Sequence, residues 1–91
     1  MIRQIIVVEN RLGLHARAAA KLVQLASRFR SDVRLAREGR AEAIDSRSIL
    51  GILMLAAGRG TRLEVSISGS DEVEAGEAIL QLFASRFGED L

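Results

Sequence analysis

The chain lacks cysteine, proline, tryptophan and tyrosine altogether, and its 91 residues include one histidine. Without cysteine, no disulfide, thiolate chemistry or cysteine-based metal site can form. A single histidine also argues against zinc binding. The aromatic residues are three phenylalanines, which disfavours binding of single-stranded nucleic acid by stacking bases on aromatic side chains. Nothing in this composition implies a metal or an organic cofactor within the chain.

An excess of charge of either sign is also missing. The 13 lysine and arginine residues nearly balance the 12 aspartate and glutamate residues. The basic residues are spread along the chain, so we expect no strong field for nucleic acid. The longest apolar run, residues 49–57 with Gly51 inside it, is far below the roughly 20 residues that span a bilayer. Residues 1–4 show no signal-peptide architecture. We therefore expect a cytoplasmic protein that does not insert into a membrane.

The histidine stands where a glycine-containing loop leads into a helix-like segment. Residues 11–21 read Arg-Leu-Gly-Leu-His-Ala-Arg-Ala-Ala-Ala-Lys, with His15 at the junction and Arg17 two residues further on. The first N–H groups of a helix have no partner within the helix and its dipole end is positive, so this junction suits an anion. A neutral imidazole at this place can attack phosphorus, with Arg17 and the free amides holding the phosphoryl oxygens.

The same residues also fit an ordinary surface. A lone histidine near a helix start is usually a polar surface residue or a satisfied hydrogen-bonding group, and Arg17 would then be a solvated charge. Gly13 would serve only a turn, because glycine adopts positive φ without a Cβ clash. The residues at the junction leave both interpretations open.

Hydrophobic periodicity divides the chain into short elements. β-branched residues predict a strand over residues 2–8, and helical spacing predicts a helix from residue 16 to about residue 29. The other expected elements are a hairpin of strands 32–37 and 40–44, a short helix 49–55 closed by Gly58 and Gly60, a strand 62–68, and a last helix that starts at Asp71, with Glu74 completing a capping box, and ends near residues 87–88.

The order β-α-β-β-α-β-α predicts an α+β fold. A hairpin in the middle of mixed elements indicates a four-stranded antiparallel sheet with the helices on one face. The length suits one small domain over residues 1–91.

Two segments resemble one known family. Residues 13–17, Gly-Leu-His-Ala-Arg, look like the active-site signature of HPr, the phosphocarrier of the bacterial phosphoenolpyruvate-dependent phosphotransferase system. Residues 48–54, Ser-Ile-Leu-Gly-Ile-Leu-Met, are similar to the family's regulatory-serine segment and follow at the expected distance. The resemblance covers essentially the whole chain and implies an HPr-like open-faced β-sandwich, with three helices on one face of the sheet.

The resemblance also implies a phosphoryl carrier rather than an independent enzyme. His15 would accept a phosphoryl group on Nδ1 from the phosphohistidine of enzyme I and pass it to a histidine of an EIIA-type protein. Arg17 would stabilise the phosphoryl charge, and the backbone amides of Ala16, Arg17 and Ala18 would hold its oxygens. HPr proteins usually have proline directly after the arginine. Here that residue is Ala18, which restores an N–H and loosens a constraint on φ.

By the same resemblance, Ser48 corresponds to the serine that an HPr kinase/phosphorylase modifies in some bacteria. From the residues alone, Ser48 is a helix N-cap. The two roles are compatible, because a phosphate at a helix N-terminus is electrostatically favoured. Ser46 is a neighbouring alternative that does not align with the family's serine.

The short apolar helix after Ser48 carries the candidate docking residues. The resemblance implies that Ile49, Leu50 and Leu53 lie beside the histidine and dock partners, with Ile52 and Leu55 facing inward. The alternative is that all of them belong to the core. Because this helix is apolar nearly all round, it cannot bury every side chain against one sheet, and a small exposed apolar patch is typical of a transient interface.

Two branches of the phosphotransferase system stay open for this chain. Residues 82–90 and 53–55 resemble the nitrogen-related branch carrier, NPr, whereas residues 48–51 resemble an HPr regulated by a kinase. The second function class is a non-catalytic regulatory binding module with the HPr fold, against which the intact pair of His15 and Arg17 argues. We expect a monomer in either case.

Overall fold

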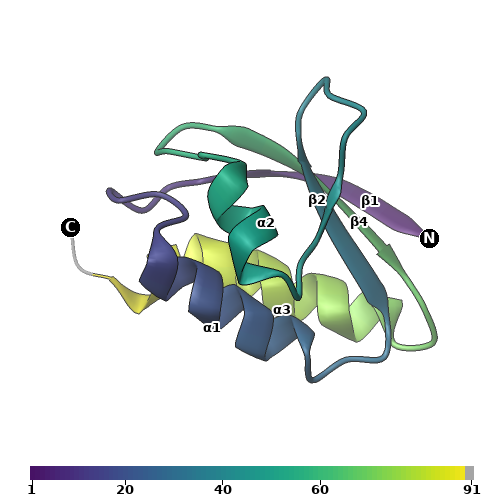
Figure 1. Ribbon diagram of the computed structural model, residues 1–91. Coiled ribbons are helices and arrows are strands. Elements are labelled where there is room, and N and C mark those ends of the chain that lie inside the picture. Colours follow the sequence, from purple (N-terminus) through teal and green to yellow (C-terminus); the bar gives the residue numbers. More distant parts are fainter. Residues whose placement is uncertain (90–91) are drawn as a thin grey trace.

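The computed structural model describes residues 1–89, so residue 90 of the segment that resembles NPr lies outside the described residues. Its elements follow one another in the predicted order (Figure 1). They are β1 Ile2–Val7, α1 Ala16–Ala26, β2 Asp32–Arg37, β3 Ile44–Asp45, α2 Ile49–Met54, β4 Arg62–Ser68, α3 Glu72–Ala84 and a 3₁₀ turn, η1, at Arg86–Gly88.

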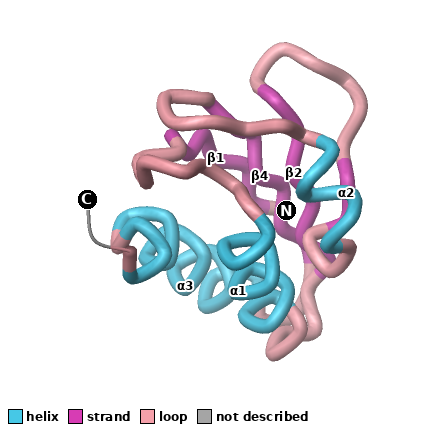
Figure 2. Tube along the Cα trace, turned by 60° about the vertical axis from the view of Figure 1, so that its left-hand side comes forward, coloured by secondary structure: helices cyan, strands magenta, loops and turns pink. Residues whose placement is uncertain are grey.

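The strands form a single four-stranded sheet in the order β1-β4-β2-β3, with every neighbouring pair antiparallel. β4 is therefore central, and Val65 on it pairs with Gln4 of β1 and Leu35 of β2. The helices lie together on one face of this sheet and leave the other face uncovered (Figures 1 and 2). The predicted α+β open-faced sandwich is confirmed.

The core lies between the sheet and the helices. Leu63, Val65 and Ile67 alternate along β4 with more exposed residues and are fully buried on the helix side, as a strand covered on one face requires. Gly76 of α3 lies so close to the sheet that an added Cβ would stand 3.2 Å from Cδ1 of Ile67. The glycine inside α3 thus allows close packing of this helix on β4, at a cost of about 1 kcal/mol in helix propensity.

Three predicted boundaries are wrong. The last helix, predicted to end near residues 87–88, ends at Ala84, because Arg86 and Phe87 have φ of 58° and cannot continue a right-handed helix. α1 ends at Ala26 rather than near Phe29, because the next amides, of Arg28 and Phe29, bond three residues back in tighter turns, and the Ser27 hydroxyl donates to the Val23 carbonyl. The strand predicted over residues 40–44 is reduced to Ile44–Asp45, which pair with β2. Only the end of this polar segment reaches the sheet.

Two predicted caps are also wrong. α2 ends at Met54, and the first residue after it with positive φ is Ala56, at 50°, so neither Gly58 nor Gly60 closes this helix. Asp71 precedes α3 but makes no side-chain capping bond to it. Its carboxylate accepts hydrogen bonds from the backbone amides of Arg30 and Ser31 instead, at 2.9 and 3.0 Å. A distant loop competes successfully for the carboxylate that the capping box would have used.

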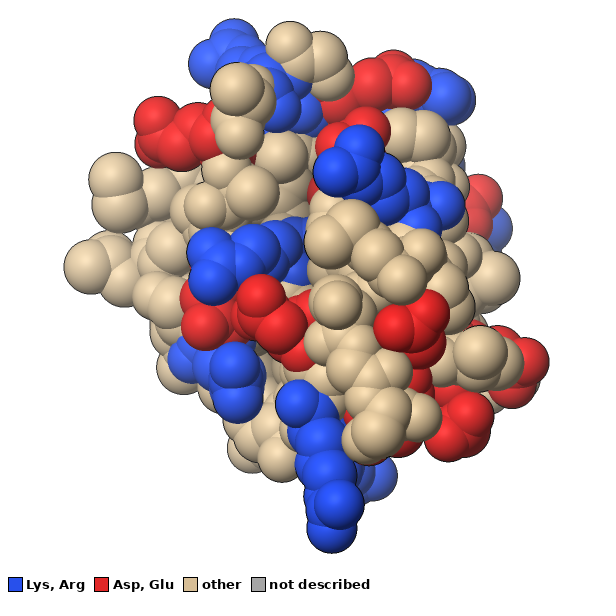
Figure 3. All heavy atoms as spheres, turned by 90° about the vertical axis from the view of Figure 1, so that its right-hand side faces the viewer, with Lys and Arg blue, Asp and Glu red and all other residues tan. Residues whose placement is uncertain are grey.

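Figure 3 shows both acidic and basic side chains on one face of the molecule, and over much of that face they lie next to one another. Arg62 of β4 and Glu38, directly after β2, form an exposed ion pair at 2.7 Å. Among residues 1–89, no helix has the length and apolar character needed to cross a bilayer.

Candidate functional site

His15 is the N-cap residue of α1, at the junction where the sequence places it. The loop before it is held against the segment that follows α2, since the Leu14 amide donates to the Ala57 carbonyl at 2.9 Å. Gly13 has φ of +65°, and an added Cβ would stand 2.5 Å from the same carbonyl oxygen. Gly13 therefore does more than make a turn, because it allows the loop to approach residue 57 and so places His15 at the helix end.

The two ring nitrogens of His15 have different partners. Nδ1 accepts a hydrogen bond from the Arg17 backbone N–H, with 3.3 Å between the nitrogens. Nε2 lies against the carboxylate of Glu89, at the far end of the chain. A nitrogen that accepts carries no proton, and a nitrogen beside a carboxylate is a donor. The contacts therefore favour the tautomer with the proton on Nε2 and the lone pair on Nδ1.

Glu89 is fixed by a second partner. The Asn10 side-chain nitrogen donates to Oε1 of Glu89 at 3.0 Å and to the Gly13 carbonyl at 2.7 Å. Burial by itself raises the pKa of Glu89, but the hydrogen bonds from His15 and Asn10 outweigh it, and the pKa is lower than usual. At neutral pH, Glu89 is thus an anion beside Nε2.

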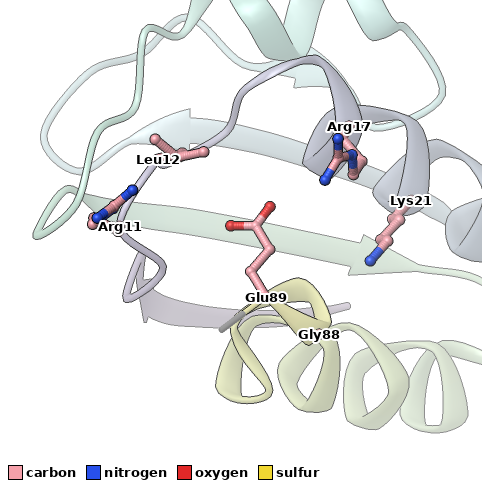
Figure 4. Close-up of a pocket in the computed structure, with 6 residues that line it drawn as sticks. All are labelled: Arg11, Leu12, Arg17, Lys21, Gly88 and Glu89. Atoms are coloured by element: carbon pink, nitrogen blue, oxygen red, sulfur yellow. The ribbon is translucent and has the colours of Figure 1, made fainter. Parts of the chain in front are cut away.

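A polar pocket of about 300 Å³ opens beside the start of α1. Figure 4 shows Arg11 from the loop, Arg17 and Lys21 from α1, and the Glu89 carboxylate pointing up between them. Leu12 and Gly88 complete the lining. Arg17 is exposed, and the backbone amides of Ala16, Arg17 and Ala18 belong to the first turn, where N–H groups lack partners within the helix. This arrangement presents a nucleophilic nitrogen next to groups that bind an anion.

The two candidate serines differ in accessibility. Ser48 is exposed and is the N-cap of α2, with its hydroxyl oxygen accepting the Gly51 N–H at 3.0 Å. The N-cap interpretation of Ser48 is confirmed. Ser46 is completely buried, so its hydroxyl is not accessible to a modifying enzyme. The structure thus favours Ser48 over Ser46 as an accessible hydroxyl.

The side chains of α2 divide as the sequence interpretation expects. Ile49, Leu50 and Leu53 are 44%, 70% and 37% exposed, whereas Ile52 is completely buried. Leu55, directly after the helix, is partly buried and packs against the core. An apolar surface therefore remains on α2, which we call the α2 patch and define as Ile49, Leu50 and Leu53.

Sequence reasoning missed Asn10, Lys21 and Glu89. Asn10 had a local signal, because an asparagine three residues before a left-handed glycine is a common turn residue. Lys21 lies one helical turn after Arg17 on the same face of α1. Glu89 had no such signal, since 74 positions separate it from His15. Among residues 1–89, there is no group of three side chains able to hold a metal ion.

Known proteins resemble this chain over most or all of its length. The profile of the family described as "PTS HPr component phosphorylation site" matches residues 2–85. The phosphocarrier protein HPr of Cupriavidus necator is 49% identical over 89 residues, covering 98% of each chain. The phosphocarrier protein NPr of Proteus mirabilis is 42% identical over 85 residues, covering 93% of each. The crystal structure of HPr-C-His from Thermoanaerobacter tengcongensis superposes over all of both chains with a TM-score of 0.92 and 38% identity.

The chain therefore belongs to the HPr family of phosphocarrier proteins, as its signature segments indicated. It is a phosphocarrier of the phosphotransferase system rather than an independent catalyst. Because names of both branches occur among its relatives, HPr and NPr, the choice between sugar transport and nitrogen-related regulation stays open.

Proposed function

We propose that His15 accepts a phosphoryl group on Nδ1 from the phosphohistidine of enzyme I and passes it to a histidine of an EIIA-type protein. The observation that carries this proposal is the orientation of the ring. Nδ1 faces the Arg17 amide at the helix start, and Nε2 faces Glu89. Nδ1 is thus the nitrogen with the lone pair, and it lies where an arriving anion meets the first turn of α1.

The transfer is a displacement at phosphorus between two imidazoles. The Nδ1 lone pair of His15 forms the new P–N bond, and the donor's P–N bond breaks with its electron pair returning to the donor nitrogen. If the donor ring is protonated, it leaves as neutral imidazole, while the ring of His15 becomes a phosphoimidazolium that keeps its Nε2–H. Proton number and charge then balance without a further acid or base.

The residues of the pocket stabilise the transferred group. The long hydrogen bond from the Arg17 amide to Nδ1 must break as the lone pair is used, which releases this N–H for a phosphoryl oxygen. The amides of Ala16 and Ala18 and the Arg17 guanidinium offer further donors. Phosphoryl transfer depends mainly on such positioning and electrostatic stabilisation.

The first test is intact-mass spectrometry after incubation with enzyme I, magnesium and phosphoenolpyruvate. Wild type should gain one phosphate, labile to acid and stable to base. His15→Asn, which keeps a good N-cap residue, should gain none while showing the circular dichroism spectrum of the wild type. Phosphate of the same lability on His15→Asn would overturn the assignment, because the chain has no other histidine.

Docking of the partners on the α2 patch belongs to the same proposal. The patch is exposed and apolar, and α2 packs against α1, the helix that begins at His15. A small patch of this kind suits partners that bind and leave in turn. Enzyme I and the EIIA-type acceptor would therefore contact Leu50 while their histidines reach Nδ1.

Phosphorylation of Ser48 by an HPr kinase/phosphorylase is a separate proposal, supported by the exposure of its hydroxyl at the start of α2. A phosphate at this place would put two negative charges next to the α2 patch. It would then hinder docking of enzyme I. Incubation with kinase and ATP, followed by peptide mapping of wild type and Ser48→Ala, tests it: modification of both chains alike would assign the site elsewhere.

A further inference from the structure

We propose that Glu89 is a positioning residue for His15. Its carboxylate holds the proton on Nε2, which keeps the lone pair on Nδ1, and it balances the positive charge that the ring carries once Nδ1 has taken a phosphoryl group. This inference rests on the proposed function of His15. It adds a third group to the site, drawn from the opposite end of the chain.

The conformation of the C-terminal segment, residues 86–89, brings the Glu89 carboxylate to His15. Arg86, Phe87 and Gly88 have φ of 58°, 58° and 71°, so three successive residues are left-handed. For the two residues that carry a Cβ, this conformation costs about 1–2 kcal/mol each. The chain accepts it because Phe87 is 1% exposed in the core and its carbonyl accepts a hydrogen bond from Lys21 of α1. The segment thereby lies beside the start of α1 (Figure 1), where Phe87 contacts Lys21 and Glu89 contacts His15.

Asn10 holds the carboxylate in place from the other side. Its side chain is completely buried and joins Oε1 of Glu89 to the Gly13 carbonyl. The remaining oxygen, Oε2, meets Nε2 of His15. The side chains of Glu89 and His15 are 14% and 25% exposed, so the contact is largely shielded from water. A buried amide that fixes one oxygen leaves the other with a single orientation toward the ring.

The chemistry explains why an anion belongs beside Nε2 but not beside Nδ1. The bonds that point outward from the two ring nitrogens diverge, so the carboxylate at Nε2 stays away from the position of a phosphoryl group on Nδ1. When Nδ1 bonds to phosphorus with Nε2 still protonated, the ring becomes cationic, and Glu89 forms an ion pair with it. Carboxylate partners of functional histidines fix tautomer and orientation in the same way.

The charged groups that line the pocket together with Glu89 of the C-terminal segment are Arg11 on the loop and Arg17 and Lys21 on α1. Glu89 is the one anion in that set. Removing its charge should therefore make a protonated phosphohistidine less stable against deprotonation. A protonated ring is the better leaving group, so the acid-promoted hydrolysis of the phosphohistidine reports on this effect.

The experiment compares wild type with Glu89→Gln, which keeps an acceptor oxygen but loses the charge, and Glu89→Ala, which loses both. Glu77→Gln removes an exposed carboxylate of α3 and is the matched control. Three quantities are measured on each: phosphoryl uptake from enzyme I under single-turnover conditions, the pH profile of phosphohistidine hydrolysis, and solvent exchange of the Nε2–H proton by NMR.

In Glu89→Gln, we expect uptake to fall about tenfold, the lower end of the range for such partners, and the hydrolysis profile to shift to lower pH. In Glu89→Ala, the Nε2–H proton should exchange faster as well. Glu77→Gln should match wild type in all three. Rates and profiles equal to wild type in both Glu89 variants would overturn the proposal, even with phosphorylation intact.

The exchange measurement needs no phosphorylation, so it separates this proposal from the function on which it rests. If no chain becomes phosphorylated, the carrier function of His15 fails, and the positioning role in transfer fails with it. If all chains are phosphorylated but Nε2–H exchange is the same in wild type and Glu89→Ala, the carrier function stands and the role of Glu89 is refuted.

Discussion

The rings of Phe83 and Phe87 meet edge to face, with their centroids 4.9 Å apart and their planes at 70°. Phe83 is the last buried residue of α3, and Phe87 lies in the turn beyond it. Both side chains are 1% exposed. This contact anchors the C-terminal segment in the core and so brings Glu89 to His15.

Phe87→Ala should therefore destabilise the fold and weaken the site at once. Truncation of a buried phenylalanine costs about 3–5 kcal/mol, and for a domain of this size each kcal/mol lowers the melting temperature by roughly 4–8 °C. Leu80→Ala on α3, where the side chain is 46% exposed, should change stability by about 0.5 kcal/mol or less. Urea unfolding of both variants measures the difference, and equal losses would contradict the packing described for Phe87.

Gly13→Ala should destabilise more than Gly39→Ala. Both glycines have positive φ, at 65° and 84°, but an added Cβ meets the Ala57 carbonyl oxygen at 2.5 Å in the first case and nothing within 4 Å in the second. Each variant suffers backbone strain of about 1–2 kcal/mol. Only Gly13→Ala adds a clash, which costs a further 1–3 kcal/mol or so. Similar free energies of unfolding for the two would show that the loop adjusts without strain.

Leu50→Asp should separate docking from stability. Leu50 is 70% exposed, so the free energy of unfolding should change by about 0.5 kcal/mol or less. Binding to enzyme I, measured by titration calorimetry, should weaken about tenfold or more, because a charge enters an apolar contact. Ile52→Ala, on the buried face of α2, should instead lower stability by about 2–5 kcal/mol. A large fall in melting temperature for Leu50→Asp would place Leu50 in the core.

Ala18→Pro restores the proline that HPr proteins usually have after the arginine and tests how this residue affects the lifetime of the phosphohistidine. Ala18 is completely buried in the first turn of α1, where a proline ring removes one N–H without breaking a helical bond. We propose that this N–H donates a hydrogen bond to a phosphoryl oxygen. Without it, the phosphohistidine of Ala18→Pro should hydrolyse faster than that of wild type. Identical hydrolysis rates at the same pH would show that the Ala18 N–H does not stabilise the phosphoryl group.

Asp71 should make stability depend on pH in the acid range. The Ser31 hydroxyl and the Arg30 and Ser31 amides stabilise its charged form and hold its pKa below 3.8, the ordinary value for aspartate. Because the folded pKa is lower than the unfolded one, this stabilisation is complete above about pH 4 and disappears as the pH falls through the folded pKa. Thermal unfolding of Asp71→Asn should thus lose less stability between pH 7 and pH 3 than wild type. Glu77→Gln is the control, and an Asp71→Asn curve parallel to wild type would contradict this account.

Local sequence patterns determined most of the fold. Strict alternation over residues 62–68 predicted β4 with its bounds and its buried residues. In a strand covered on one face, every second side chain must be apolar, so the pattern determines which residues are buried. The segments around His15 and Ser48 predicted two helix starts, because capping depends on a few neighbouring residues. The boundary errors at residues 27–29 and 40–43 fell where hydrogen bonds in turns prevailed over hydrophobic spacing.

The contacts that complete the candidate site were decided by tertiary structure. Asp71 looked like a cap for α3, yet it binds a loop whose residue Ser31 is 40 positions away. Glu89 entered the sequence analysis only within the segment that resembles NPr, yet its carboxylate contacts His15 and Asn10 near the other end of the chain. A single acidic residue forms no sequence pattern that predicts its partner, because its carboxylate binds the hydrogen-bond donors that the folded chain brings near it. The sequence therefore determined the proposed nucleophile, His15, and the helix that it caps, whereas burial of Phe87 and the turn after α3 decided which carboxylate lies beside it.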